Sequence, residues 1–219
     1  LGLRFVEFDV QLSADRVPYL IHDASLTRTT RAAGDLRLMG SGQLDGIDAG
    51  EPARFGDRHS GTTLPRLAAA AELMRGIPQA RAFVEIKRAS LAHHGHARCI
   101  ERILEGIDAV KERCVAISFD AEACRLVRSS GGLPVGWVLH DTPQSSLAAL
   151  EALQPEYAFC DQRLLPSSGP LPQGSWDWAV YEVTDGASAL RLGAQGVTLV
   201  ETMAPARLLR ELGPAAGPA

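Results

Sequence analysis

This sequence of 219 residues lacks several features, and each absence excludes a class of protein. No apolar run approaches the roughly 20 residues that a helix needs to span a bilayer, so we expect no stable insertion into a membrane. The net charge of −4 argues against nucleic acid as a partner, because binding to phosphate backbones needs a basic surface. The sequence also contains neither the glycine-rich P-loop of nucleotide-binding proteins nor the ligand spacing of zinc sites.

Cysteine is scarce, and its spacing predicts no metal or redox site. None of the four cysteines belongs to a C-x-x-C pair, and three of them lie in apolar segments typical of helices or strands. We therefore interpret them as reduced, structural residues. This interpretation fits a reducing compartment, and we predict a cytoplasmic protein. The sequence starts at Leu1 instead of methionine, so it carries no information about an upstream signal peptide.

The composition is that of a globular protein, with 46% hydrophobic and 22% charged residues, and strand patterns alternate with helix patterns. This alternation is typical of βαβ units around a parallel sheet, in either a doubly wound sheet or a TIM (β/α)8-type barrel. The barrel is favoured because strands recur through the whole chain and no G-x-G-x-x-G turn follows the first one. The predicted strands are Phe5–Leu12, Val17–Ile21, Ala82–Lys87, Val115–Phe119, Pro134–Leu139, Tyr157–Cys160, Trp178–Val183 and Val197–Glu201.

We predict a single domain over residues 1–212, followed by a frayed tail over residues 213–219. The segment 24–64 is polar, glycine-rich and weakly periodic, so we interpret it as an insertion after the second barrel strand. Without Val17–Ile21, which leads directly into this insertion, seven barrel strands remain, and a closed barrel of eight needs one more. We expect that first strand and its helix to precede Leu1.

Two strand-like segments carry charges inside apolar runs, Phe5-Val6-Glu7-Phe8-Asp9 and Phe83-Val84-Glu85-Ile86-Lys87. Because side chains alternate between the faces of a strand, Glu7 and Asp9 share one face, and Glu85 holds the corresponding position in the other segment. Carboxylates are rarely buried without a partner. Three carboxylates with no cysteine or histidine at ligand spacing suit a hard divalent cation such as Mg²⁺ or Ca²⁺. Pairing of each carboxylate with a lysine or arginine is the alternative.

Three further side chains are candidates for the same site. Histidine titrates near neutrality, so His22 at the end of a strand suits proton transfer, although a lone histidine is more often structural. Lys87 lies two residues after Glu85 and either neutralises a substrate phosphate or pairs with the carboxylates. Trp178 either lines a pocket or packs in the core. The histidines of residues 93–96 are interpreted as a solvated loop, because a glycine interrupts their helical spacing.

Six N-terminal segments form a highly specific set, although each alone is a weak signal. They are Val6-Glu-Phe-Asp-Val10, Leu20-Ile-His-Asp23, Leu26-Thr-Arg-Thr-Thr30, Leu44-Asp-Gly-Ile-Asp-Ala-Gly50, Leu64-Pro-Arg-Leu67 and Val84-Glu-Ile-Lys87. Weaker matches follow at Ile117-Ser-Phe119, Trp178-Ala-Val-Tyr181 and Gly196-Val-Thr-Leu-Val-Glu-Thr202. In this order, the segments resemble the glycerophosphodiester phosphodiesterase family over nearly the whole chain.

The resemblance implies a (β/α)8 barrel that uses a divalent cation to hydrolyse glycerophosphodiesters to glycerol 3-phosphate and an alcohol. The partner that it implies is a small-molecule substrate. By position, it implies that His22 is one of two catalytic histidines, that Lys87 contacts the substrate phosphate and that Trp178 lies near the pocket. The metal ligands that it implies are Glu7, Asp9 and Glu85.

The sequence departs from the family pattern in two places. The family's first strand carries His-Arg-Gly, followed by a Pro-Glu-Asn-Thr segment, and neither occurs here. These segments supply the second catalytic histidine, a phosphate-binding arginine and a glutamate near the metal, so we expect the chain as given to have little activity. After Trp178 the family more often shows Thr and Asn, which affects the expected substrate range. A non-catalytic metal-binding barrel, or a related barrel phospholipase that acts on lipid head groups, is the alternative.

Overall fold

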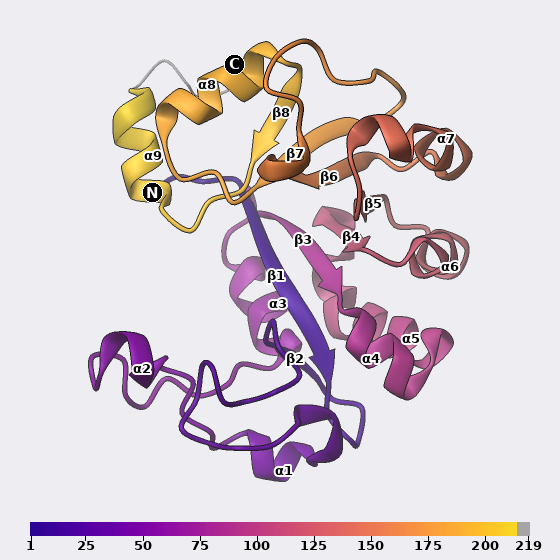
Figure 1. The fold of residues 1–219 in the computed structure, drawn as a ribbon. Coiled ribbons are helices and arrows are strands. Elements are labelled where there is room, and N and C mark those ends of the chain that lie inside the picture. The colour runs from indigo at the N-terminus through magenta and orange to yellow at the C-terminus, as the bar shows by residue number, and fades with distance from the viewer. Residues whose placement is uncertain (214–219) are drawn as a thin grey trace. The chain divides into compact units, whose positions relative to one another are not determined.

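The computed structural model describes residues 1–213, so the predicted tail lies outside the described residues except for Gly213. The chain divides into two compact units (Figure 1). The N-terminal unit comprises Arg4–Ser118 and Glu122–Leu133, and the C-terminal unit comprises residues 1–3, 119–121 and 134–213. The assignment of residues 1–212 to a single domain stays a prediction.

The N-terminal unit contains four strands in the order β2-β1-β3-β4. The strands β1 (Phe5–Leu12), β3 (Arg81–Ile86) and β4 (Cys114–Ser118) are parallel neighbours. The short strand β2 (Pro18–Leu20) is antiparallel to the C-terminal half of β1, in keeping with its exclusion from the barrel strands. In β3 every residue after Arg81 is buried, as expected for a parallel strand that is covered on both faces.

Five helices of the N-terminal unit follow these strands or connect them. The helix α3 (Leu67–Arg75) buries Leu67, Ala71 and Met74, which recur at helical spacing. After β3 the chain forms α4 (Arg88–His94), α5 (His96–Ile107) and the 3-10 helix η2 (Asp108–Arg113), and after β4 it forms α6 (Ala121–Gly131). The interpretation of residues 93–96 as a loop was wrong, because only Gly95, with φ of 82°, interrupts the two helices.

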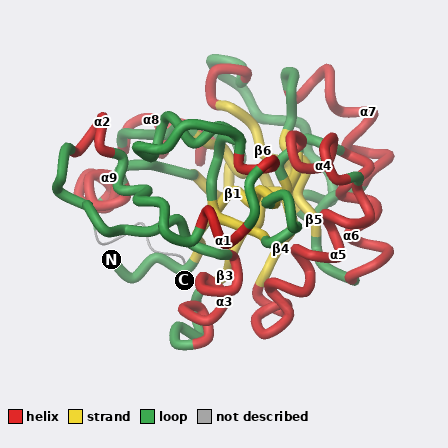
Figure 2. The backbone as a smooth tube through the Cα atoms, turned by 90° about the horizontal axis from the view of Figure 1, so that it is seen from below, coloured by secondary structure: helices red, strands yellow, loops and turns green. Residues whose placement is uncertain are grey.

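The segment 24–64, predicted as an insertion, consists mostly of loop (Figure 2). Its short helices are η1 (Leu36–Leu38), α1 (Ser41–Leu44) and α2 (Pro52–Phe55). Together with β2 and the residue after it, this segment forms a small apolar core. Its buried residues are Tyr19, Ile21, Leu26, Leu36, Leu44 and Leu64. This core explains how a polar, weakly periodic segment holds a defined position beside β2.

The C-terminal unit repeats the strand and helix alternation with parallel strands in the order β5-β6-β7-β8. The aspartate before α8 caps that helix, because the Oδ1 atom of Asp185 accepts a hydrogen bond from the backbone N–H of Ser188 at 2.8 Å. The elements are β5 (Val135–Val138), α7 (Pro143–Leu153), β6 (Tyr157–Asp161), η3 (Gln162–Leu164), β7 (Asp177–Tyr181), α8 (Gly186–Ala194), β8 (Val197–Val200) and α9 (Pro205–Leu212).

The four cysteines are buried as free thiols, which confirms the prediction that they are reduced, structural residues. Burial raises the pKa of Cys160 to about 12, well above the pKa of a reactive cysteine.

Within residues 1–213, no helix combines the length and the apolar character needed to cross a membrane.

Replacing Gly50 with alanine tests how tightly the segment 24–64 is packed. A Cβ atom at Gly50 would lie 2.5 Å from the backbone carbonyl oxygen of His59, so we expect Gly50→Ala to lower the free energy of unfolding by about 1–3 kcal/mol. Gly42→Ala is the matched control, because nothing lies within 4 Å of its Cβ position in α1, and it should raise stability by about 0.5–1 kcal/mol. Urea unfolding of both variants measures the difference; equal stability would contradict the packing.

Candidate metal centre

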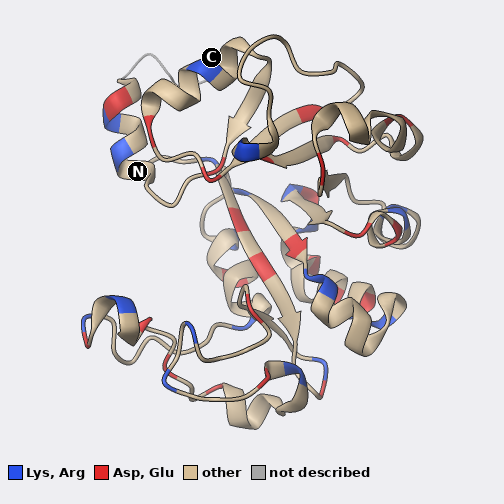
Figure 3. Ribbon diagram, in the orientation of Figure 1, with Lys and Arg blue, Asp and Glu red and all other residues tan. Residues whose placement is uncertain are grey.

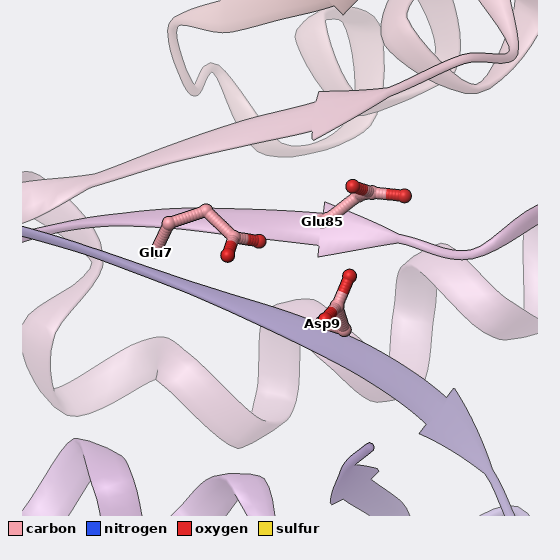
Figure 4. A group of neighbouring side chains, drawn as sticks. All are labelled: Glu7, Asp9 and Glu85. Atoms are coloured by element: carbon pink, nitrogen blue, oxygen red, sulfur yellow. The ribbon is translucent and has the colours of Figure 1, made fainter. Parts of the chain in front are cut away.

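Three carboxylates from two neighbouring strands meet in the N-terminal unit. Glu7 and Asp9 project from the same face of β1, and the parallel register places Asp9 opposite Glu85 of β3. One carboxylate oxygen from each residue lies within 4.8 Å of the other two. Figure 4 shows the side chains of Glu7 and Asp9 on β1 beside that of Glu85 on β3. The structure therefore brings together the three residues that the sequence predicted as metal ligands.

Lys87 lies beside these carboxylates and pairs with two of them. Its Nζ atom is 3.0 Å from Oδ1 of Asp9 and 2.7 Å from Oε1 of Glu85. The side chains are only 12–20% exposed, so water screens these charges weakly. Figure 3 shows the acidic positions on β1 and β3 and a basic position where α4 begins. Of the two roles left open for Lys87, pairing with the carboxylates is the one observed, and contact with a phosphate stays a prediction.

Burial and charge act in opposite directions on the ionisation of this cluster. Burial raises the pKa of Glu85, and the ammonium of Lys87 lowers it in part. For Lys87 burial alone would lower the pKa, but the carboxylates of Glu85 and Asp9 outweigh burial and raise it. Lys87 therefore stays positively charged beside Asp9 and Glu85. A divalent cation would add further positive charge next to the carboxylates.

The chemistry of the three side chains fits such a cation. All the donor atoms are carboxylate oxygens, which are the ligands that Mg²⁺ and Ca²⁺ prefer over softer metals. Among residues 1–213, this is the group of acidic, histidine and cysteine side chains whose atoms approach closely enough to hold a metal ion. The metal-ligand roles of the three residues stay predictions.

The predicted catalytic histidine lies at the end of a short chain of charged hydrogen bonds. Nδ1 of His22 is 2.6 Å from Oδ1 of Asp23, and Nε of Arg28 donates to Oδ2 of Asp23 at 2.5 Å. The guanidinium of Arg28 lowers the pKa of Asp23, His22 lowers it further, and burial opposes both. The residue before the histidine is tied to the carboxylate strand, because the backbone N–H of Ile21 donates to the carbonyl oxygen of Asp9 at 3.1 Å. The loop of His22 therefore starts beside the carboxylates.

Sequence reasoning missed Arg28 and the contact of Asp23 with His22. The available signal was the adjacency of Asp23 to His22, together with the arginine in the matched segment Leu26-Thr-Arg-Thr-Thr30. A contact across five residues of irregular loop has no periodic pattern, so spacing alone does not predict it.

A buried polar pair, also missed, fixes the backbone of the histidine. Nε2 of Gln11 donates to the carbonyl oxygen of His22 at 3.0 Å, and Oε1 of Gln11 accepts from Oγ of Ser90 at 2.8 Å. Gln11 is 1% exposed and Ser90 is fully buried, so neither group has water as an alternative partner. A glutamine inside strand β1 was the available signal of a buried polar contact, although it did not indicate that the partners lie in α4 and in the loop of His22.

Trp178, the predicted substrate-binding tryptophan, packs in the apolar core of the C-terminal unit. It is 2% exposed, and its Nε1 atom donates to the carbonyl oxygen of Pro172 at 2.9 Å. Its ring makes an edge contact with Trp176 at a centroid distance of 6.3 Å. This is the core-packing alternative that the sequence left open. Its role near a substrate stays a prediction.

Parallel strands alternating with helices, with carboxylates on adjacent strands, define an α/β barrel-type protein with a candidate cation site, and solved structures match this fold over nearly the whole chain. A phosphodiesterase of Oleispira antarctica, solved in complex with the product sn-glycerol-3-phosphate, has a TM-score of 0.79 at 21% identity and covers 94% of this chain and 84% of its own. A glycerophosphodiester phosphodiesterase of Agrobacterium tumefaciens has a TM-score of 0.70 at 25% identity, covering 94% and 87%.

Sequence comparison gives the family. Residues 1–170 match the model of the glycerophosphoryl diester phosphodiesterase family, and the chain belongs to that family. A curated glycerophosphodiester phosphodiesterase of Caldanaerobacter subterraneus subsp. tengcongensis is 29% identical over 130 residues. That alignment covers 58% of this chain and 51% of the relative, so the chain spans about half of the length of that protein. The family resemblance and the barrel-type fold predicted from the sequence are thus confirmed.

Removing the charge of Lys87 tests whether it holds the carboxylates together. In chelator-treated protein we expect Lys87→Met to lower the free energy of unfolding by about 2–4 kcal/mol, because it leaves Asp9 and Glu85 poorly solvated and unneutralised. Lys111→Met, on η2, is the control and should change stability by about 0.5 kcal/mol or less. Chemical unfolding measures both changes, and equal effects would show that Lys87 does not stabilise the cluster.

Proposed function

We propose that this chain hydrolyses glycerophosphodiesters to sn-glycerol 3-phosphate and an alcohol, with a divalent cation held by Glu7, Asp9 and Glu85. The observation that carries the proposal is the convergence of these three carboxylates within 4.8 Å in a member of the phosphodiesterase family. The product-bound structure of the Oleispira antarctica relative supports the substrate class.

The electrostatics of the site support a requirement for the cation. A phosphodiester is an anion, and the carboxylates of Glu7, Asp9 and Glu85 would repel it. When bound, the cation would neutralise this repulsion, polarise a phosphate oxygen and lower the pKa of a coordinated hydroxyl. Lys87, already poised between Asp9 and Glu85, adds a positive charge close to the phosphate and stabilises the charge that develops on its oxygens.

His22 supplies the proton transfer in this proposal. Hydrolysis removes a proton from the attacking hydroxyl and adds one to the leaving alkoxide, so a general acid or base lowers the barrier at either end. The His-Arg-Gly and Pro-Glu-Asn-Thr segments, which by the family resemblance supply a second catalytic histidine and a phosphate-binding arginine, do not occur in the 219 residues. We therefore propose that these 219 residues by themselves have a turnover at least about 10²–10⁴-fold below that of family members that have both histidines.

A direct assay tests the proposal. Release of sn-glycerol 3-phosphate from glycerophosphocholine, measured with Mg²⁺, with Ca²⁺ and after chelation, should depend on the cation. We expect His22→Gln to lower kcat by a further 10²-fold or so, because it removes the remaining acid/base group. His59→Gln, in the segment 24–64, is the matched control and should leave turnover unchanged. Release that survives both chelation and His22→Gln would refute the proposed function.

The second candidate is a non-catalytic cation-binding protein of the same family, because the three carboxylates could hold a cation without any acid/base group. Cation binding distinguishes the two candidates. At a concentration of 100 times Kd, Mg²⁺ or Ca²⁺ should raise the free energy of unfolding by about 2.7 kcal/mol. Glu85→Gln should abolish this gain, whereas the control Glu72→Gln, at an exposed position on α3, should keep it. Stabilisation by the cation without any turnover would support the second candidate, and no stabilisation would contradict both.

A further inference from the structure

The ring of His22 lies where packing alone does not determine its orientation. Its side chain is 58% exposed, so few neighbouring atoms block rotation about its torsion angles. The backbone of His22, in contrast, is held by the buried amide of Gln11. The orientation and the protonated nitrogen of the ring therefore depend on the polar partners of the side chain.

Asp23 provides such a partner and is itself held in place. One of its carboxylate oxygens lies 2.6 Å from Nδ1 of His22, and the other accepts from Nε of Arg28 at 2.5 Å. An ionised carboxylate accepts hydrogen bonds and donates none, so Nδ1 must carry the proton in this pair. The lone pair of a neutral ring is then on Nε2.

We propose that Asp23, anchored by Arg28, is a positioning residue that keeps His22 protonated at Nδ1 and leaves Nε2 as the nitrogen that exchanges the proton of the reaction. The effect on catalysis rests on the proposed function, whereas the tautomer is a property of the folded chain. The lowered pKa of Asp23, caused first by Arg28, agrees with an ionised carboxylate near neutral pH.

Arg28 determines how the amide would be oriented in the variant Asp23→Asn. An asparagine has one oxygen, and the Nε–H donor of Arg28 requires it. The amide NH₂ group then faces His22 and donates to Nδ1, which moves the ring proton to Nε2. The conservative Asn variant thus enforces the wrong tautomer, whereas Asp23→Ala leaves the ring free to adopt either one.

The first measurement is the tautomer itself. Ring ¹⁵N–¹H correlation spectra of the full chain, recorded at alkaline pH and assigned with His22→Gln, should show a ring protonated at Nδ1. In Asp23→Asn the signal should shift to the pattern of a ring protonated at Nε2, and in Asp23→Ala it should show a mixture. Asp57→Asn is the matched control, because Asp57 forms a similar pair with Arg31 at 2.5 Å in the same segment. An Nδ1-protonated ring in every variant would overturn the proposal.

The second measurement is turnover with glycerophosphocholine. We expect kcat to fall about 10-fold in Asp23→Ala and about 10²-fold in Asp23→Asn, with KM nearly unchanged because Asp23 acts through His22. Adding Arg28→Leu to Asp23→Asn removes the donor that orients the amide and should restore kcat towards the Asp23→Ala level. An Asn variant as active as the parent, or a loss in Asp57→Asn of equal size, would overturn the proposal. If the parent shows no turnover, the proposed function fails, and the spectra still decide the role of Asp23.

Discussion

The parallel pairing of β1 with β3 places Asp9 opposite Glu85, and the candidate site depends on this register. Glu7 lies two residues before Asp9, and Lys87 two residues after Glu85, so the alternation of side chains carries all four groups to one face. A slip of one residue in β3 would exchange its two faces, so that Glu85 would take the place of an apolar side chain such as Val84. Burial of Val84, which is fully buried, thus holds the charged face in place as well.

The charges on that face explain the character of the site. Carboxylates held a few ångströms apart and largely shielded from water repel one another, and Lys87 relieves the repulsion between Asp9 and Glu85. A fold that keeps such a cluster is suited to a divalent cation, and a cation in turn suits an anionic phosphodiester. The histidine side of the site differs, because His22 and Arg28 are more than half exposed and are held by hydrogen bonds instead of burial.

Much of the secondary structure was predictable from local sequence patterns. Every predicted strand is present, with bounds within two residues, because apolar alternation and the bounding Gly, Pro, Asp and Ser residues are local signals. The contacts of Arg28 and of Gln11 were not predictable, because they join residues across a loop or between β1 and α4. The core position of Trp178 was one of two open alternatives, since the sequence near a tryptophan does not reveal which way its ring turns.

The sequence by itself determined the family, the alternation of strands and helices and the parity that puts Glu7 and Asp9 on one face. These follow from residue order and from the two-residue repeat of a strand. Only the tertiary structure decided that Glu85 lies beside Asp9, that Lys87 bridges the two, and that Asp23 and Arg28 hold His22. Such contacts depend on strand register and loop path, which are set by the packing of residues far apart in the chain.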